Sequence, residues 1–274
     1  MIKNVRNWMA HRHLLVTMVG RELKARYRGT VLGYFWSFLN PLLLLTVYSV
    51  VFGKILPGSS GRIHNQDITG INYSLFLFTG LMPWIWFSTS VLDAANVLFV
   101  QGNLVKKIRF PVEVLPMMSV AANMMHFLFG MPILMLSVVL LGKGVTLTWW
   151  ALLLPVIMLI QVVFTLGFAF WVSALTAHFR DLKDLINNFL TLWFFGTPII
   201  YAFETPQIKN NPLLVWFLSL NPLTHIVEGY QYIFFFGRLP HYRKLGVTLL
   251  VGLVLLVSGY RLFDRLRDTF CEEV

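Results

Sequence analysis

The sequence predicts an all-α membrane protein with six membrane-spanning helices per chain, and two observations predict it. Of the 274 residues, 57% are hydrophobic and 12% are charged, whereas a soluble domain has about 45–50% apolar and about 25% charged residues. So few charges do not cover the surface of an ordinary soluble globule. In addition, the chain contains charge-free runs that reach the length needed to cross a bilayer, about 20 helical residues.

Five long runs are the predicted spans one to five, and a shorter run is the sixth. The sixth run is lengthened by Arg243, Lys244 and Arg261, because long basic side chains reach the interface. The predicted spans are 29–53, 68–92, 114–142, 144–179, 185–203 and 245–260. No linker or repeat divides the chain, so we expect a single domain. It comprises an interface helix at 1–30, spans one to five within 31–203, a re-entrant region at 204–244, and the sixth span with a cytoplasmic tail at 245–274.

The run 210–227 differs from the others because prolines interrupt it. Pro212 and the pair Asn221-Pro222 lie inside it, and Glu228 follows its end. A proline inside a span frees a backbone carbonyl that lipid cannot satisfy. We therefore expect 206–237 to form a hairpin of two short helices that enters the outer leaflet and returns, with a kinked seventh span as the alternative.

The distribution of Lys and Arg predicts that the N- and C-termini are cytoplasmic. Segments 1–30, 101–113 and 178–184 hold twelve of these residues, whereas segments 53–72 and 143–148 hold three. Basic residues accumulate on the cytoplasmic side of membrane proteins. The net charge of +10 has the same origin and indicates contact with anionic lipid rather than with nucleic acid.

The N-terminal segment carries apolar residues at helical spacing between basic residues. This pattern is typical of a helix that lies in the cytoplasmic headgroup plane, although basic residues flanking a first span would produce a similar composition. We expect Gly29 and Gly33 to turn the chain into the first span, and Asn40-Pro41 to break the helix inside that span. The basic side of the predicted interface helix includes Arg21, Lys24, Arg26 and Arg28.

The sequence contains no motif for nucleotide hydrolysis, metal binding or covalent catalysis. Its only Gly-Lys pairs, at 53–54 and 142–143, are not followed by Ser or Thr, so no P-loop is expected. One cysteine, scattered histidines and the absence of H-E-x-x-H predict no metal site. Asp93 is the one acid well inside a span, and such an acid is a candidate functional residue. Alternatively, it pairs locally or reaches cytoplasmic water.

Three blocks of sequence support a family resemblance. The first, at 21–42, reads R-E-L-K-x-R-Y-R-G-T-x-L-G-Y-x-W-S-x-x-N-P-L, and the others lie at 103–116 and 220–230. With these blocks the chain resembles, from about residue 12 to 265, the membrane subunits of type-2 ATP-binding-cassette exporters. Within that class it is most similar to the O-antigen exporters, beside the capsule and teichoic acid exporters, which move cell-surface polysaccharides.

The resemblance implies partners and a location. It implies a homodimer in the bacterial inner membrane, two copies of a separate ATPase subunit that use ATP and Mg, and a lipid-linked polysaccharide substrate. The chain itself would bind no cofactor and would not be an enzyme. We expect a transport subunit, most consistent with O-antigen export. Permeases for capsule, teichoic acid, a small lipid or a drug are alternatives, and a membrane-embedded glycan acyltransferase is the alternative from another class.

The resemblance also implies a coupling helix between the second and third spans that docks on the ATPase. Pro111 suits the first turn of a helix and Glu113 its positive N-terminal end, while Pro116 closes that helix or opens the next. The turn 179–184 lies near the ATPase in the family, although its two basic and two acidic residues could simply neutralise one another. The ATPase-coupling candidates are Lys106, Lys107, Arg109, Phe110, Pro111, Glu113, Arg180 and Asp181.

Aromatic and amide side chains are candidates for the glycan channel. Sugar rings present apolar C–H faces and hydroxyl rims, which suit modest contacts with such a wall. Interface belts and packing between helices are the alternative explanation for the aromatics. The channel candidates are Tyr34, Trp36, Asn40, Tyr48, Trp84, Trp86, Phe87, Asn188, Trp193, Phe194 and Tyr201; the outer-gate candidates are Asn221, Pro222 and Glu228.

Overall fold

The computed structural model describes residues 12–55, 62–63, 66–67, 70–106, 110–142, 148–179 and 181–270. These residues are almost entirely helical. The longer helices are α2 (Arg12–Tyr27), α3 (Trp36–Val50), α4 (Gly70–Val100), α6 (Val114–Leu141), α7 (Leu154–His178), α8 (Leu182–Phe195), α10 (Pro212–Leu220), α11 (Pro222–Phe234) and α12 (Tyr242–Leu266). Short elements connect them: η1 (Gly33–Phe35), η2 (Val51–Ile55), β1 (Arg62–Ile63), β2 (Gln66–Asp67), α5 (Gly102–Val105), η3 (Trp149–Leu153), α9 (Pro206–Lys209) and η4 (Arg267–Thr269).

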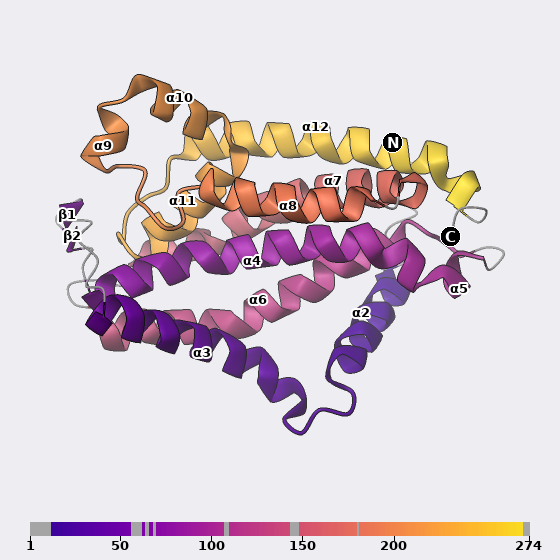
Figure 1. The fold of residues 1–274 in the computed structure, drawn as a ribbon, viewed down its shortest axis with the longest axis horizontal. Coiled ribbons are helices and arrows are strands. Elements are labelled where there is room, and N and C mark those ends of the chain that lie inside the picture. Colours follow the sequence, from indigo (N-terminus) through magenta and orange to yellow (C-terminus); the bar gives the residue numbers. More distant parts are fainter. Residues whose placement is uncertain are drawn as a thin grey trace.

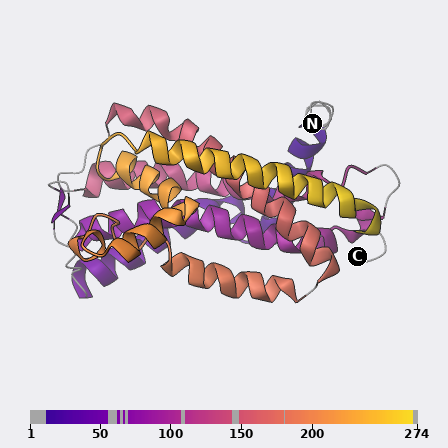
Figure 2. The same cartoon turned by 90° about the horizontal axis from the view of Figure 1, so that it is seen from above.

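The helices form an elongated bundle. α4, α6, α7 and α12 run along its length (Figure 1), and α8 lies along one side of it (Figure 2). α2, α5 and the C-terminal part of α12 gather at one end, which we call the α2 end. The antiparallel pair β1–β2, α9 and α10 lie at the opposite end, which we call the hairpin end.

Among the described residues, five helical segments are long and apolar enough to cross a membrane. They are Gly33–Val50, Gly70–Val100, Val114–Leu141, Trp149–His178 and Tyr242–Thr269. These correspond to predicted spans one to four and six, so those five spans are confirmed as helices. Positive φ angles at Gly29 and Gly33, of 78° and 51°, turn the chain from α2 toward α3 as expected.

The prediction that Asn40-Pro41 breaks the first span is wrong, because α3 is continuous through Pro41. Pro41 is the sixth residue of α3. A proline there removes one backbone hydrogen bond near the helix N-terminus, and the ordered turns that follow are unaffected.

The predicted fifth span is not a single spanning helix. α8 covers only 14 residues, and the backbone from Gly196 onward is bent. Side chains satisfy the carbonyls of this bent segment: Asn221 donates to Gly196 O at 3.0 Å, Gln231 to Pro198 O at 3.0 Å and Tyr73 to Ile200 O at 2.7 Å. Irregular backbone within membrane proteins needs such partners, and here α4 and the α10–α11 region supply them.

The region 206–237, predicted as two short helices, contains three, and the two longer ones, α10 and α11, each begin with Asn-Pro. Asn211 Oδ1 accepts hydrogen bonds from Leu213 N and Leu214 N, and Asn221 Oδ1 accepts one from Leu223 N. An Asn at the N-cap followed by Pro at the first helical position is a favourable helix start. With 9 and 13 residues, neither helix is long enough to span alone.

α7 and α12 form the most closely packed helix pair. A Cβ placed on Gly259 of α12 would lie 2.7 Å from Gly167 O, and one on Gly167 of α7 would lie 2.7 Å from Leu256 N. Small residues that let two backbones approach this closely are typical of membrane helix interfaces. The backbones of the two helices are therefore in close contact at these glycines.

The buried apolar residues form two large clusters. One extends over α4, α7, α11 and the bent segment after α8, and it includes Phe76, Trp86, Phe164 and Ile199. The other lies at the α2 end and joins α2, α4, α5, α6, α7 and α12. Its members are Met18, Val97, Leu98, Val105, Val112, Val114, Leu115, Met118, Phe170, Ala174, Ala177, Phe263 and Phe270. We call this second group the end cluster.

Candidate functional site

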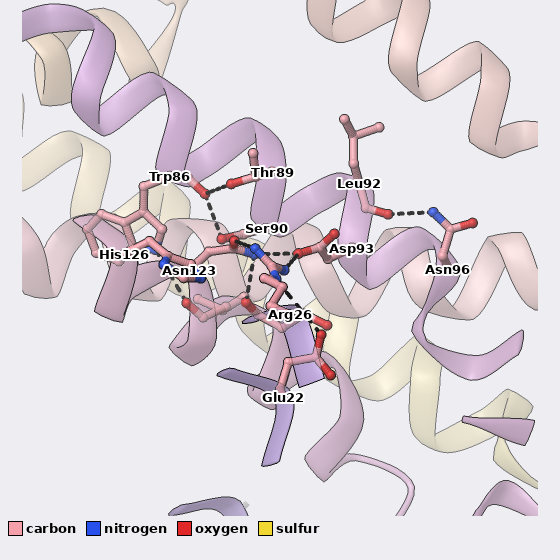
Figure 3. A network of polar contacts seen from close by, with 12 residues as sticks. Glu22, Arg26, Trp86, Thr89, Ser90, Leu92, Asp93, Asn96, Asn123 and His126 are labelled. Atoms are coloured by element: carbon pink, nitrogen blue, oxygen red, sulfur yellow. Dashed lines mark hydrogen bonds and ion pairs between the residues drawn. The ribbon is translucent and has the colours of Figure 1, made fainter. Parts of the chain in front are cut away.

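Arg26 connects α2 to two spans at the α2 end. Its Nη1 donates to Asn123 Oδ1 of α6 at 3.0 Å, and its Nη2 pairs with Asp93 Oδ2 of α4. Asn123 Nδ2 donates to the same Asp93 oxygen at 2.7 Å, and Glu22 lies 4.0 Å from Arg26 Nε. Figure 3 shows Arg26 between these groups. Arg26 is thus held by residues of three helices, and Asp93 has a specific partner.

A second polar contact lies beside the first and joins α2, α3 and α6. The Tyr27 hydroxyl lies 2.8 Å from Ser37 Oγ and 3.2 Å from His126 Nδ1, and Ser37 Oγ is also 3.2 Å from His126 Nδ1. The Tyr27 and His126 rings meet edge to face at 5.7 Å. These contacts fix the position of the elbow between α2 and α3 relative to the third span.

An open cavity of about 480 Å³ adjoins both contacts, between α2, α3, α4 and α6. The cavity exists because α3 packs only loosely against the other helices. In the apolar span that contains α3, 11% of the residues are buried, against 78% in that of α4. One end of the cavity is polar and the remainder is apolar. Its lining is Arg26, Tyr27, Ser37, Asn40, Pro41, Leu44, Met82, Ile85, Trp86, Thr89, Asn123, His126 and Phe127.

The predicted coupling segment is described only in part. Lys106 is exposed at the end of the single-turn helix α5, and Lys107 and Arg109 lie outside the described residues. Phe110 and Pro111 are half-buried. Glu113 occupies the N-cap position of α6, is 8% exposed, and pairs with Arg267 Nη1 at 3.9 Å. Pro116 lies in the first turn of α6, so it opens the third span.

The second predicted ATPase-facing turn connects α7 and α8. Arg180 lies outside the described residues, and Asp181 is exposed at the N-cap position of α8. His178, the last residue of α7, hydrogen-bonds through Nε2 to Thr269 Oγ1 at 3.0 Å. This turn is therefore close to the C-terminal end of the described chain.

The interface-helix candidates divide into two groups. Arg21, Lys24 and Arg28 are exposed on or just after α2, as expected for a basic side. Arg26 instead turns to the bundle and pairs with Asp93. The apolar side is narrow, because only Met18 and Leu23 of α2 are buried. Residues 1–11 of the predicted interface helix lie outside the described residues.

The channel candidates separate into buried and exposed groups. Trp84, Trp86 and Phe87 are buried against other helices of the same chain. Phe87 contacts Trp193 at a ring distance of 5.4 Å and Trp84 contacts Phe194 at 5.6 Å, so these rings attach α8 to α4. The more accessible candidates are of two kinds: Tyr34, Asn40 and Asn188 are exposed, and Trp36, Tyr48, Trp193, Phe194 and Tyr201 are half-buried.

Asn221 is a hydrogen-bonding centre in the outer-gate region. Beyond its N-cap bond, its Oδ1 accepts from Trp193 Nε1 at 2.9 Å, and its Nδ2 donates to Gly196 O and to Thr197 Oγ1 at 2.9 Å. The turn between α10 and α11 is therefore tied to the end of α8. Pro222 is the first residue of α11.

Glu228 is the other outer-gate candidate with specific partners. It is 4% exposed, and its Oε2 lies 3.6 Å from His225 Nδ1 and 3.7 Å from Lys244 Nζ. A carboxylate this far from water depends on a cationic neighbour, which here is the Lys244 ammonium group. Glu228 thereby connects α11 to the first turn of α12.

Comparison with known proteins identifies the family. Residues 13–235 match the family model described as ABC-2 type transporter. The chain belongs to the ABC-2 type transporter family. It is similar to the "O-antigen export system permease protein RfbA" of Myxococcus xanthus, with 39% identity over 274 residues and 100% of both chains. The protein of the same name from Klebsiella pneumoniae is 32% identical over 260 residues, 94% of each chain. The "Polysialic acid transport protein KpsM" of Escherichia coli is 24% identical over 249 residues, 89% of each chain.

In this ABC-2 chain, sequence reasoning did not find two ion pairs that involve candidate site residues. The sequence indicates one member of the Arg26–Asp93 pair, because an acid inside a span is unusual. It does not single out Arg26, which is one of several similar basic residues on α2. The Glu113–Arg267 pair joins residues 154 positions apart, and no local pattern indicates it. Both pairs lie at the α2 end.

Proposed function

We propose that this chain is the permease subunit of an ATP-driven exporter that moves a lipid-linked polysaccharide, most consistent with O-antigen, across the membrane. One observation carries the proposal: the chain aligns over its entire length, at 39% identity, with a protein named as an O-antigen export permease. A membrane-embedded glycan acyltransferase is not favoured, because the relatives named above are transport proteins.

The proposed assembly is a homodimer with two copies of a separate ATPase subunit, which use ATP and Mg. Exposed amides on α3 and α8 support a second copy. Asn40 is exposed on α3, whose other exposed residues are largely apolar, and Asn188 is exposed on α8, where Leu185, Phe189 and Leu192 are exposed as well. Unpartnered amides are costly in lipid, so we expect these faces to meet a partner or a water-filled path. A two-fold axis is the usual symmetry of such a pair.

The proposed orientation places the α2 end in the cytoplasm of a bacterial cell and the hairpin end outside the inner membrane. The excess of basic residues in segments 1–30 and 101–113 supports it. The coupling candidates Lys106–Glu113 and Asp181 then face the ATPase subunits. The α10–α11 pair then lies at the outer leaflet, where Asn221 and Glu228 hold it against α8 and α12.

The proposed mechanism passes force from the ATPase to the spans. Closure of the ATPase pair displaces the coupling segment, which continues directly into α6 through the N-cap residue Glu113. α2 moves with it, because Arg26 is bonded to α4 and α6. The loosely packed α3 then shifts and opens the path along the faces that carry Asn40 and Asn188. ATP acts in this scheme only by binding two states of the complex unequally.

Disruption of the gene tests the proposal. The disrupted strain is expected to lose surface polysaccharide and to accumulate the lipid-linked glycan in the cytoplasmic leaflet, and the intact gene restores export. Chemical analysis of the accumulated glycan distinguishes O-antigen from capsular polysaccharide or teichoic acid. Unchanged surface glycan together with loss of a small lipid from the outer leaflet would contradict the proposal.

A further inference from the structure

The last described residues of the chain pack against the helices and do not extend into solvent. α12 ends at Leu266, η4 follows, and Phe270 is 0% exposed. A charged tail after a final span is ordinarily solvated. Here the Phe270 ring contacts the Phe263 ring at 5.0 Å and the His178 ring at 6.1 Å. The end of the described chain is therefore part of the end cluster.

Two polar contacts tie residues 267–270 to two different turns at the α2 end. Arg267 Nη1 lies 3.9 Å from Glu113 Oε2, at the N-cap of α6. Thr269 Oγ1 is hydrogen-bonded to His178 Nε2 at 3.0 Å, and Thr269 also donates to Leu266 O at 2.7 Å, which fixes the turn itself. Glu113 ends the segment between the second and third spans, and His178 precedes the turn between α7 and α8. Residues 267–270 thus bridge the two turns.

The bridge is anchored to the closely packed α7–α12 pair. Residues 267–270 continue from α12, whose backbone packs against α7 at Gly167 and Gly259. On the other side of the bridge, α5 has a single turn, and Phe110 and Pro111 are half-buried. Arg267 and Phe270 therefore connect Glu113 and His178 to the C-terminal end of α12.

We propose that residues 267–270 form a C-terminal brace that positions the coupling segment against the α7–α12 pair. This inference rests on the proposed function, and it names how the ATPase stroke is transmitted. Arg267 and Phe270 are positioning residues, because they act through Glu113 and His178. Without the brace, the coupling segment is displaced locally and does not transmit the movement. Less glycan is then moved for each ATP hydrolysed.

The brace is tested by measuring glycan export per ATP hydrolysed in proteoliposomes that contain the permease and its ATPase. Phe270→Ala is expected to lower this ratio about fivefold or more, the scale of a typical coupling free energy, while the ATPase still copurifies. Phe270→Leu, which keeps an apolar side chain, is expected to retain most of it. Arg267→Glu faces Glu113 with a like charge and is expected to lower the ratio, and Glu113→Gln in the same chain is expected to relieve part of that loss.

Arg265→Glu is the matched control, because Arg265 is exposed in the last turn of α12 and undergoes the same charge change. It is expected to leave the ratio unchanged. If Phe270→Ala fails to assemble, the Arg267→Glu and Glu113→Gln pair decides, because Arg267 is a surface residue. Wild-type export with an unchanged ratio in Arg267→Glu and Phe270→Ala, or an equal loss in Arg265→Glu, would overturn the brace. Absence of export by the wild-type complex would instead overturn the proposed function.

Discussion

Arg26, in the helix that precedes the first span, forms an ion pair with Asp93 of the second span, and Asn123 of the third span hydrogen-bonds to both. Three segments that are far apart in the sequence are therefore fixed to one another at the α2 end. The pair is only partly shielded, since the side chains of Arg26 and Asp93 are 33% and 39% exposed. The pair therefore contributes more to the position of α2 than to the free energy of folding.

A double-mutant cycle with Arg26→Gln and Asp93→Asn measures this pair. We expect a coupling energy of about 0.5–1 kcal/mol in thermal unfolding in detergent, because a partly exposed pair is screened by solvent. Lys24→Gln combined with Asp93→Asn is the control, since Lys24 is exposed on the same helix. Coupling that is equal in both cycles would contradict the assigned pairing.

Asn221→Ser is expected to destabilise the protein more than Asn211→Ser. Serine retains the N-cap at both positions, but only Asn221 also bonds to Trp193, Gly196 and Thr197. Each lost hydrogen bond costs about 1 kcal/mol. Unfolding midpoints of the two variants measure the difference, and equal midpoints would show that Asn221 is no more than a helix cap.

Tyr73→Phe is expected to lower the free energy of unfolding by about 1–2 kcal/mol, because it leaves the carbonyl of Ile200 without its hydrogen bond. Tyr242→Phe is the control, since Tyr242 is exposed and the same hydroxyl is removed. Thermal unfolding of both variants provides the comparison. The explanation of the bent segment after α8 fails if Tyr73→Phe unfolds at the wild-type temperature.

Gly259→Ala is expected to destabilise the protein by about 1–3 kcal/mol, because the added methyl group would lie 2.6 Å from Trp171 Cδ1 and force the α7–α12 pair apart. Gly246→Ala in the same helix has no atom within 4 Å of the added group and is expected to be neutral or slightly stabilising. A similar loss in both variants would indicate a general intolerance of α12 rather than close packing.

The sequence predicts a span well where the thickness of the bilayer alone determines the length of the apolar helix. The run at 114–142 becomes α6 almost residue for residue, and the run at 68–92 corresponds to α4, which continues past it to Val100, because apolar length is a local property. The fifth run fails for a non-local reason: its bent backbone is stable only because Tyr73, Asn221 and Gln231 reach it from elsewhere. Pro41 was misjudged because its effect depends on its position within the helix, which the sequence defines only loosely.

The candidate site was predictable in outline and not in its contacts. The Asn221-Pro222 break and the acid at 93 were visible as violations of an apolar pattern. The sequence does not identify Trp193 and Arg26 as their partners, because contacts between residues far apart in the chain produce no pattern of spacing. The aromatics at 84–87 illustrate the opposite difficulty: their composition suits a glycan channel, yet in this chain they pack against α6, α7 and α8.

Transport by purified components tests the central claim most directly. The permease is reconstituted in proteoliposomes with lipid-linked glycan, with and without its ATPase subunit and Mg-ATP, and the glycan that reaches the opposite leaflet is measured. We expect ATP-dependent transfer only when both subunits are present, and no ATP hydrolysis by the permease alone. Transfer or ATP hydrolysis by the isolated permease would contradict the account.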